Sequence, residues 1–359
     1  MLPWRRLVRA AVAGTLIALL LVLADLAATG RSPLNLIQAG ARGPSAAVIE
    51  RDFPGSYLPD ATGHDGQQFY AIARQPMHWH ALAADLDRVA YRLQRPLLPW
   101  LAWALHPSGG GPGLVLALVA VGLAALFAGA LAFGAVAVMF GGSPSWAAAF
   151  PLVPGAVVAL RITTADALAT ALALGAVALL VRRRDGLAVL AAVAAVLAKE
   201  TSVLIVLGYA LWRRDRASVR AAIAALGVGG ALMAVLRLTF PSAGRQVMEF
   251  GFPLAGLARA AAHWTHGHDL LAMIAVVGSV ALAVAALRRG GLRNPFGWAV
   301  AAHLALLSVL NYDVVGLNLN GTRTVLPLTA CAILGLVASH RAGAATSTSA
   351  ADELSHLPS

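Results

Sequence analysis

Residues 114–140 read LVLALVAVGLAALFAGALAFGAVAVMF, a continuous apolar stretch without one charged side chain. A helix needs about 20 such residues to cross the hydrocarbon core of a bilayer. The rest of the chain has the same bias, because 59% of its 359 residues are hydrophobic and only 12% are charged. A soluble domain has about 25% charged residues. The sequence therefore predicts an all-α protein that is embedded in a membrane.

This stretch and the other apolar runs of the chain predict a polytopic protein with about ten transmembrane helices. These are expected at residues 10–29, 114–140, 145–161, 164–181, 187–198, 202–212, 219–240, 270–287, 296–311 and 324–339. Together they form a single transmembrane domain over residues 1–341. The Ser-, Thr- and Ala-rich tail at residues 342–359 is expected to be disordered and cytoplasmic.

Arginine clusters give these helices a direction, because the cytoplasmic flanks of transmembrane helices collect Lys and Arg. Counting alternately from a cytoplasmic N-terminus places the clusters on the cytoplasmic side, at residues 5–9, 182–184, 213–220, 288–293 and 341. Both termini are then cytoplasmic, and the plasma membrane is the expected location. The N-terminal helix fits an uncleaved signal anchor, although a signal peptide has a similar pattern.

Residues 30–112 are the one long segment outside the apolar runs, and this orientation places them on the extracytoplasmic face. Within this loop, the run PLLPWLAWALH at residues 96–106 is too short to cross a bilayer and is rich in Trp. Such a run is typical of an interfacial helix that lies along the membrane surface.

The chain carries a formal charge of +11, yet its basic residues occur in short clusters between apolar runs. This pattern fits cytoplasmic anchoring better than the basic face of a nucleic-acid-binding protein, so no nucleic-acid partner is predicted. Cys331 is the only cysteine, which excludes an intrachain disulfide and a thiolate metal cluster.

The most informative motif of the loop is GHDGQQFYAIAR at residues 63–74. Asp65 precedes a helix-compatible run, where its carboxylate would project toward a bound substrate. The same position also fits a helix N-cap in a solvated loop, and both interpretations stay open on spacing alone.

This motif resembles the first external loop of the GT-C superfamily of membrane glycosyltransferases, which includes aminoarabinose transferases and protein O-mannosyltransferases. Those families carry Asp-Glu, an aromatic residue and a run similar to Ala-x-Ile-Ala-Arg. Asp65, the aromatic pair Phe69-Tyr70 and the run Ile72-Ala73-Arg74 match this pattern. Gly66 replaces the Glu, which leaves a requirement for a divalent cation open.

The resemblance implies that the protein transfers a sugar from a polyprenyl-phosphate-linked donor to a glycan, lipid or protein acceptor. The donor would be embedded in the membrane lipid. The reaction would invert the anomeric centre on the extracytoplasmic face, with Asp65 as the general base. The resemblance extends more weakly to other outer positions, which are Asp166, Lys199, Glu200 and Arg323.

Each of these positions also has a structural interpretation. Asp166 follows Thr163 and Thr164 and would fit a helix N-cap. Lys199, the only lysine of the chain, would form a structural ion pair with Glu200. Charged residues between apolar helices are costly and usually face a cavity or one another, which favours a functional role.

A planar guanidinium fork matches two phosphate oxygens, so arginines on the outer face would suit a lipid phosphate. The predicted substrate- and lipid-phosphate-binding residues are Gln68, Tyr70, Arg92, Arg95, Arg161, Asp166, Lys199, Glu200 and Arg323. Several histidines also invite a zinc interpretation, namely His78, His80 and the HWTHGH run with His263, His266 and His268, beside Asp269. Their spacing does not match the common helical two-His signature, so no metal site or cofactor is predicted.

Two other functions are compatible with the sequence. A lipid or polysaccharide transporter or flippase would also place polar residues among apolar helices. No paired repeat halves are visible, however, and the charges gather at the outer ends instead of the midplane where transporters bind. A non-enzymatic partner in envelope assembly is the other alternative, and Gly66 in place of Glu is the feature that fits it best.

Overall fold

The computed structural model describes the backbone of residues 2–30, 32–107, 109–241, 249–265, 267 and 269–355, and side chains as far as His340. Within these ranges the secondary structure is helical. No β-strand forms there, and two isolated bridges join Gly40 to Asp60 and Phe250 to Leu310. The predicted all-α class is confirmed.

Five stretches are long and apolar enough to cross a membrane. An α-helix satisfies its own backbone hydrogen bonds, which is why such runs fold as helices in lipid. The first three are α1 (Trp4–Thr29), α8 (Pro112–Met139) and α14 (Arg216–Thr239). The fourth joins α16 (Asp269–Gly290) to the short η4 (Gly291–Arg293), and the fifth joins α19 (Asn318–Thr324) to the start of α20 (Leu326–Ser355).

Four further apolar helices are shorter than a bilayer crossing of about 20 residues. They are α11 (Asp166–Val181), α12 (Asp185–Ala198), α13 (Val203–Arg213) and α17 (Gly297–Val309). A short 3₁₀ turn, η3 (Glu200–Ser202), connects α12 to α13. Ten membrane crossings therefore stay a prediction, whereas the structure shows, among the described residues, five helical stretches long and apolar enough to cross a membrane.

The helix expected at residues 145–161 is divided into three pieces. These are η2 (Pro144–Ala148), α9 (Ala149–Leu152) and α10 (Pro154–Arg161). Val153 between the last two is extended, with φ −60° and ψ 127°, because a residue before proline avoids the helical region. Pro154 also lacks the N–H that would continue the helical hydrogen bonds.

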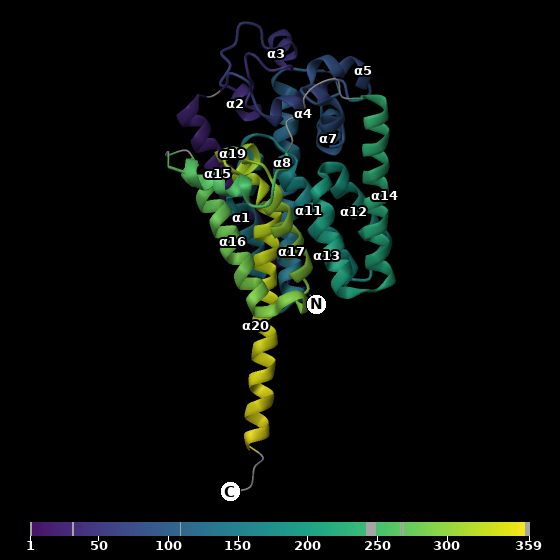
Figure 1. Ribbon diagram of the computed structural model, residues 1–359, viewed down its shortest axis with the longest axis vertical. Helices are drawn as coiled ribbons and strands as arrows, with labels where there is room; N and C mark the ends of the chain where they lie inside the picture. The colour runs from purple at the N-terminus through teal and green to yellow at the C-terminus, as the bar shows by residue number, and fades with distance from the viewer. Residues whose placement is uncertain are drawn as a thin grey trace.

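The segment predicted as an outer loop folds into a cap of short helices over one end of the bundle (Figure 1). The cap consists of α2 (Leu34–Ile37), α3 (Ala46–Asp52), α4 (Asp65–Arg74), α5 (Trp79–Leu82), η1 (Ala83–Asp85), α6 (Val89–Leu93) and α7 (Leu97–Leu105). α7 corresponds to the interfacial helix predicted at residues 96–106. It packs on α4 and α8, burying Leu98 and Ala102 while Leu101 and Leu105 stay exposed.

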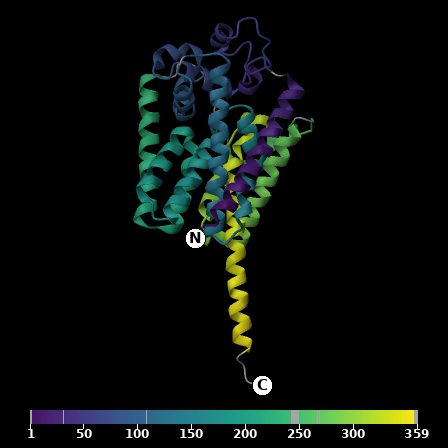
Figure 2. The ribbon, with the colours of Figure 1, turned by 180° about the vertical axis from the view of Figure 1, so that it is seen from behind.

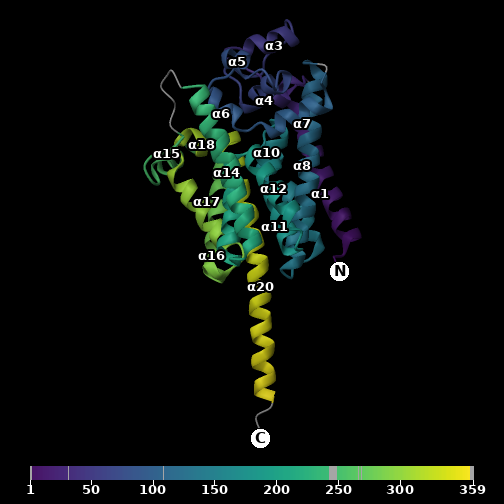
Figure 3. The same ribbon diagram turned by 90° about the vertical axis from the view of Figure 1, so that its right-hand side faces the viewer.

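The N-terminus and the turn between α13 and α14 lie at the end of the bundle opposite the cap (Figures 1 and 3). Seen from behind, α1 runs beside α8 (Figure 2), and Leu7 and Ala11 pack against Ala130 there. The Arg-rich turn after α13 and the cap are thus at opposite ends, as the predicted orientation requires. α20 extends past the bundle as a helix to Ser355, whereas the sequence predicts disorder from residue 342.

The remaining helices, α15 (Ala255–His263) and α18 (Tyr312–Val315), lie near the cap side. In Figure 1, α14 rises to the level of the cap, whereas α12 and α13 end below it. The turn at Lys199 and Glu200 therefore faces the underside of the cap, and this arrangement positions the site.

Candidate functional site

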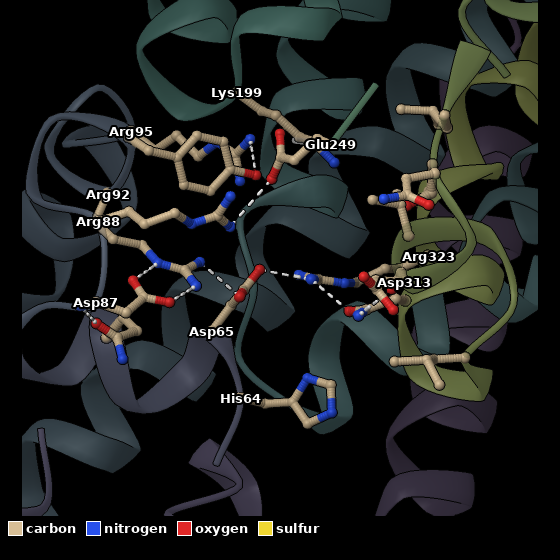
Figure 4. Close-up of a pocket in the computed structure, with 18 of the residues that line it drawn as sticks. His64, Asp65, Asp87, Arg88, Arg92, Arg95, Lys199, Glu249, Asp313 and Arg323 are labelled. Atoms are coloured by element: carbon tan, nitrogen blue, oxygen red, sulfur yellow. Dashed lines mark hydrogen bonds and ion pairs between the residues drawn. The ribbon is translucent and has the colours of Figure 1, made fainter. Parts of the chain in front are cut away.

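A cavity of about 680 Å³ lies between the cap and the bundle. The cap contributes charged and polar side chains, including His64, Asp65, Gln68, Arg88, Arg92 and Arg95. The bundle contributes Lys199, Glu200, His303 and Arg323 from three separate parts of the chain. Figure 4 shows Arg92 and Arg323 pointing toward Asp65 from opposite sides of the cavity.

The turn before α4 fixes the position of Asp65. The Asp60 carboxylate accepts hydrogen bonds from the N–H groups of Thr62 and Gly63 at 2.9 and 3.1 Å. Gly63 has φ +75°, a left-handed conformation that favours glycine. The helix then begins at Asp65, where a negative charge is favourable at the positive end of the helix dipole.

Asp65 is the centre of a continuous ion-pair network (Figure 4). One carboxylate oxygen accepts from Arg92 Nη1 at 2.6 Å, and the other accepts from Arg323 Nη2 at 2.5 Å. Arg92 also forms a bidentate pair with Asp87, with both distances at 2.7 Å. The Asp65 side chain is thus engaged by two guanidinium groups instead of capping the helix.

The network continues from Arg323 into the bundle. Asp166, the first residue of α11, accepts from Arg323 Nη1 at 3.4 Å and from Lys199 Nζ at 2.5 Å. Asp166 is buried under the cavity and does not line it. The only lysine of the chain therefore binds Asp166 and not its neighbour Glu200.

Arg95 holds Glu200 in a second ion pair beside the first network. Its Nε and Nη2 donate to the two Glu200 oxygens at 2.8 and 2.5 Å, and Nη2 also donates to the Tyr91 hydroxyl at 2.8 Å. The Tyr91 ring lies 4.3 Å from the Arg95 guanidinium carbon and 4.2 Å from that of Arg88. Such cation–π contacts fix long arginine side chains in one direction.

The charges of the network control the protonation of its acids. Burial by itself raises the pKa of the Asp65 carboxyl, but the guanidiniums of Arg323 and Arg92 outweigh this and hold the pKa well below its ordinary value. For Asp87, burial is likewise outweighed by the Arg92 guanidinium, and the pKa is lowered. Asp65 is therefore ionised at neutral pH and is a weak base.

Besides Asp166, two residues predicted for the site lie outside the cavity wall. Tyr70 points away from the cavity, donates to Asp52 at 2.6 Å and accepts from the N–H of Gly111. Arg161 pairs with Asp25 of α1 and with the carbonyl of Asn35, and it is absent from the cavity wall. Both residues tie the cap to the bundle, so they belong to the scaffold of the site.

Gly66 occupies a place where no side chain fits. A Cβ atom at this position would lie 2.4 Å from the carbonyl oxygen of Ile162 and 2.7 Å from that of Ile37. The acid that GT-C families carry after the first Asp therefore has no counterpart at this position. Gln68, two residues on, does line the cavity, and its side-chain oxygen accepts from the N–H of Asp87 at 3.4 Å.

Two buried polar groups on the cavity wall have no hydrogen-bond partner among the residues described. They are Nε of Arg323 and Nε2 of His303. Nδ1 of His303 contacts the carbonyl oxygen of Ala299 at 2.8 Å. Because a carbonyl only accepts, Nδ1 carries the proton and Nε2 is the acceptor. A buried unpaired group costs about 1–3 kcal/mol, so these two atoms lower the stability of the cavity wall.

The sequence interpretation missed several participants, notably His64, Asp87, Arg88 and Tyr91. A signal was present, because Arg88, Arg92 and Arg95 have the spacing of one helical face around Tyr91. Glu249, which pairs with Arg88 at 3.2 Å, carried no such signal.

No group of three or more His, Cys, Asp or Glu side chains suited to a metal ion occurs in the described part of the chain. His266 and His268 of the HWTHGH run lie outside the described residues. Comparison with protein-family models, with curated proteins and with solved structures finds no match to this chain.

Proposed function

We propose that this protein transfers a sugar from a polyprenyl-phosphate donor to an acceptor hydroxyl on the extracytoplasmic face of the membrane. The single observation that carries the proposal is the cavity between cap and bundle. Its cationic lining residues include Arg92, Arg95, Lys199 and Arg323, which come from three separate regions of the chain. The resemblance of the motif at residues 63–74 to GT-C enzymes gives the reaction type.

The walls of the cavity have two characters. One side is charged, and the other includes Leu306, Leu310 and Leu317, of which Leu317 is exposed. An amphiphile with an anionic head and an apolar tail fits such a surface, because guanidinium groups bind phosphate and leucines contact isoprene units. Polyprenyl-phosphate sugars have this character.

The cations would act on the leaving group. Cleavage of the bond between the anomeric carbon and the phosphate oxygen adds negative charge to the phosphate. Preorganised N–H donors stabilise such developing charge without reorganising. Arg323 lines the cavity, and its Nε is buried without a hydrogen-bond partner within the described residues.

Asp65 would orient this cationic wall. The general-base role predicted from the sequence suits it poorly, since a carboxylate shared by Arg92 and Arg323 is a weak base. Its geometry instead supports a role in aligning the two guanidinium groups toward the phosphate.

The test is sugar transfer by the purified full chain in lipid nanodiscs. The probes are radiolabelled undecaprenyl-phosphate arabinose, mannose and glucose, with octyl glycosides as acceptors. At least one donor should yield labelled glycoside together with undecaprenyl phosphate. Asp65→Asn should reduce the rate at least about 100-fold, because the amide cannot hold two guanidinium groups.

Asp85→Asn is the matched control, since Asp85 lies in the cap near Asp87 but outside the cavity. Near-normal transfer by Asp65→Asn would contradict the site. If the wild type moves labelled lipid across the bilayer but forms no glycoside with any donor, the flippase alternative would replace this proposal.

A further inference from the structure

The imidazole of His64 is the unengaged member of the cavity wall next to Asp65. Its backbone is fixed, because its N–H donates to Gln38 O at 3.0 Å and its carbonyl accepts from Gln67 N at 3.2 Å. Figure 4 shows the ring beside Asp65 and outside the network of dashed contacts. No hydrogen bond to this ring occurs among the described residues, so its nitrogen lone pair is available.

The carboxylates closest to the cations are all engaged. Asp65 and Asp87 share Arg92, while Glu200 is held by Arg95 through both oxygens. Asp166 binds Lys199 below the cavity. An acid in such a pair has its lone pairs committed and its basicity reduced. The rivals of His64 as bases are therefore Glu249, Asp313 and His303 on the same wall.

The charges around His64 favour the neutral ring. Burial is the largest influence and lowers the pKa of His64 below its ordinary 6.5. Arg323 of α19 and Arg92 of α6 lower this pKa further, while Asp65 of α4 and Asp60 of the preceding turn raise it. At neutral pH the imidazole is thus unprotonated, which is the form that accepts a proton.

We propose that His64 is the general base of the transfer and takes the proton of the acceptor hydroxyl. This inference rests on the proposed function and names the catalytic residue that it requires. The acceptor oxygen bonds to the anomeric carbon as its proton moves to a ring nitrogen. The bond from that carbon to the phosphate oxygen breaks, and its electron pair leaves with the polyprenyl phosphate. The imidazolium beside Asp65 then releases its proton to water.

The experiment measures transfer against pH for the wild type and for His64→Gln. The wild-type kcat should fall as pH drops through a value below 6.5, because protonation removes the base. His64→Gln should lose kcat at least about 100-fold and show no such fall. Its affinity for undecaprenyl phosphate, measured by binding to nanodiscs, should stay within about twofold of the wild type, a criterion that separates base loss from misfolding.

His64→Ala supplies a second readout. Added imidazole should restore transfer in proportion to its unprotonated fraction, which a structural role would not produce. His78→Gln is the matched control, since His78 is an exposed cap residue outside the cavity, and it should leave transfer unchanged.

Failure of this inference is distinct from failure of the proposed function. If the wild type transfers sugar and His64→Gln keeps both its rate and its acidic fall, His64 is not the base. If the fall of kcat at acidic pH disappears instead in Asp313→Asn, Glu249→Gln or His303→Gln, the residue changed in that variant is the general base. A wild type that transfers no sugar from any donor would overturn the function itself, and the base with it.

Discussion

Asp65 lies half-buried between two guanidinium groups, with 13% of its side chain exposed. Desolvating a charge costs several kcal/mol, and the cost is recovered only when partners satisfy both oxygens, as Arg92 and Arg323 do here. Removing one member of such a network costs about 3–5 kcal/mol, because it leaves an uncompensated charge. The same residues that would bind a phosphate therefore also hold the cap to the bundle.

Acid should weaken the fold through this network. The pKa values of Asp65 and Asp87 lie below the ordinary 3.8 despite burial, because Arg323 and Arg92 lower them. A carboxylate with a lowered folded-state pKa stabilises the fold above its unfolded pKa, and this contribution disappears as pH falls through the folded value. We expect the unfolding temperature in detergent to stay level from pH 7 to about 5 and to drop below about pH 4.

Asp65→Asn should be less stable than the wild type at pH 7 and should show a shallower drop in acid. Asp85→Asn should follow the wild-type curve. Equal acid slopes for the wild type and Asp65→Asn would show that Asp65 is not held in this way.

At the scale of elements, the lengths of α12 and α13 decide the depth of the cavity. Their 14 and 11 residues correspond to about 21 and 16 Å of helix, less than the roughly 30 Å core of a bilayer. α14 has 24 residues and reaches the cap. Because α12 and α13 are short, the turn between them, with Lys199 and Glu200, lies under the cap and below the upper end of α14.

The seating of α4 on the bundle depends on Gly66. Gly66→Ala would push a methyl group against the main chain at Ile162 and Ile37, which cannot rotate away. We expect a loss of about 1–3 kcal/mol in unfolding free energy, measured by thermal unfolding in detergent.

Gly175→Ala in α11 is the control, because a Cβ there meets nothing within 4 Å. It should leave stability unchanged or raise it by up to about 1 kcal/mol. A Gly66→Ala protein as stable as this control would mean that α4 packs less closely than the structure shows.

On the scale of the whole molecule, the predicted orientation puts the cap outside the cell and the Arg-rich turns inside. Cys331 is fully buried, so the wild type provides an unlabelled background for thiol reagents. Tyr57→Cys in the cap, where Tyr57 is 85% exposed, should react with a membrane-impermeant maleimide in intact cells. Gly186→Cys beside the 182–184 cluster should react only after permeabilisation. The reverse labelling pattern would invert the topology.

The sequence alone predicts the helical membrane class, because apolar runs in lipid must satisfy their own backbone hydrogen bonds. It also indicated that the charged residues on one face of the bundle belong together. Two predictions from the sequence were wrong. The run with Pro151 and Pro154 was expected to form one helix and is divided into three pieces. Arg161 was expected in the site and does not line the cavity, because a local sequence pattern does not specify which distant residues meet.

The pairing of the charged residues follows from the packing of distant segments. Asp65 and Arg323 are 258 residues apart in sequence, and no periodicity relates them. Their contact arises because the cap folds back over the short helices and a buried charge must find its partner there. The sequence supplied the charged residues, but the packing of the cap on the bundle committed Asp65 to ion pairs and left the His64 ring without a hydrogen-bond partner among the residues described.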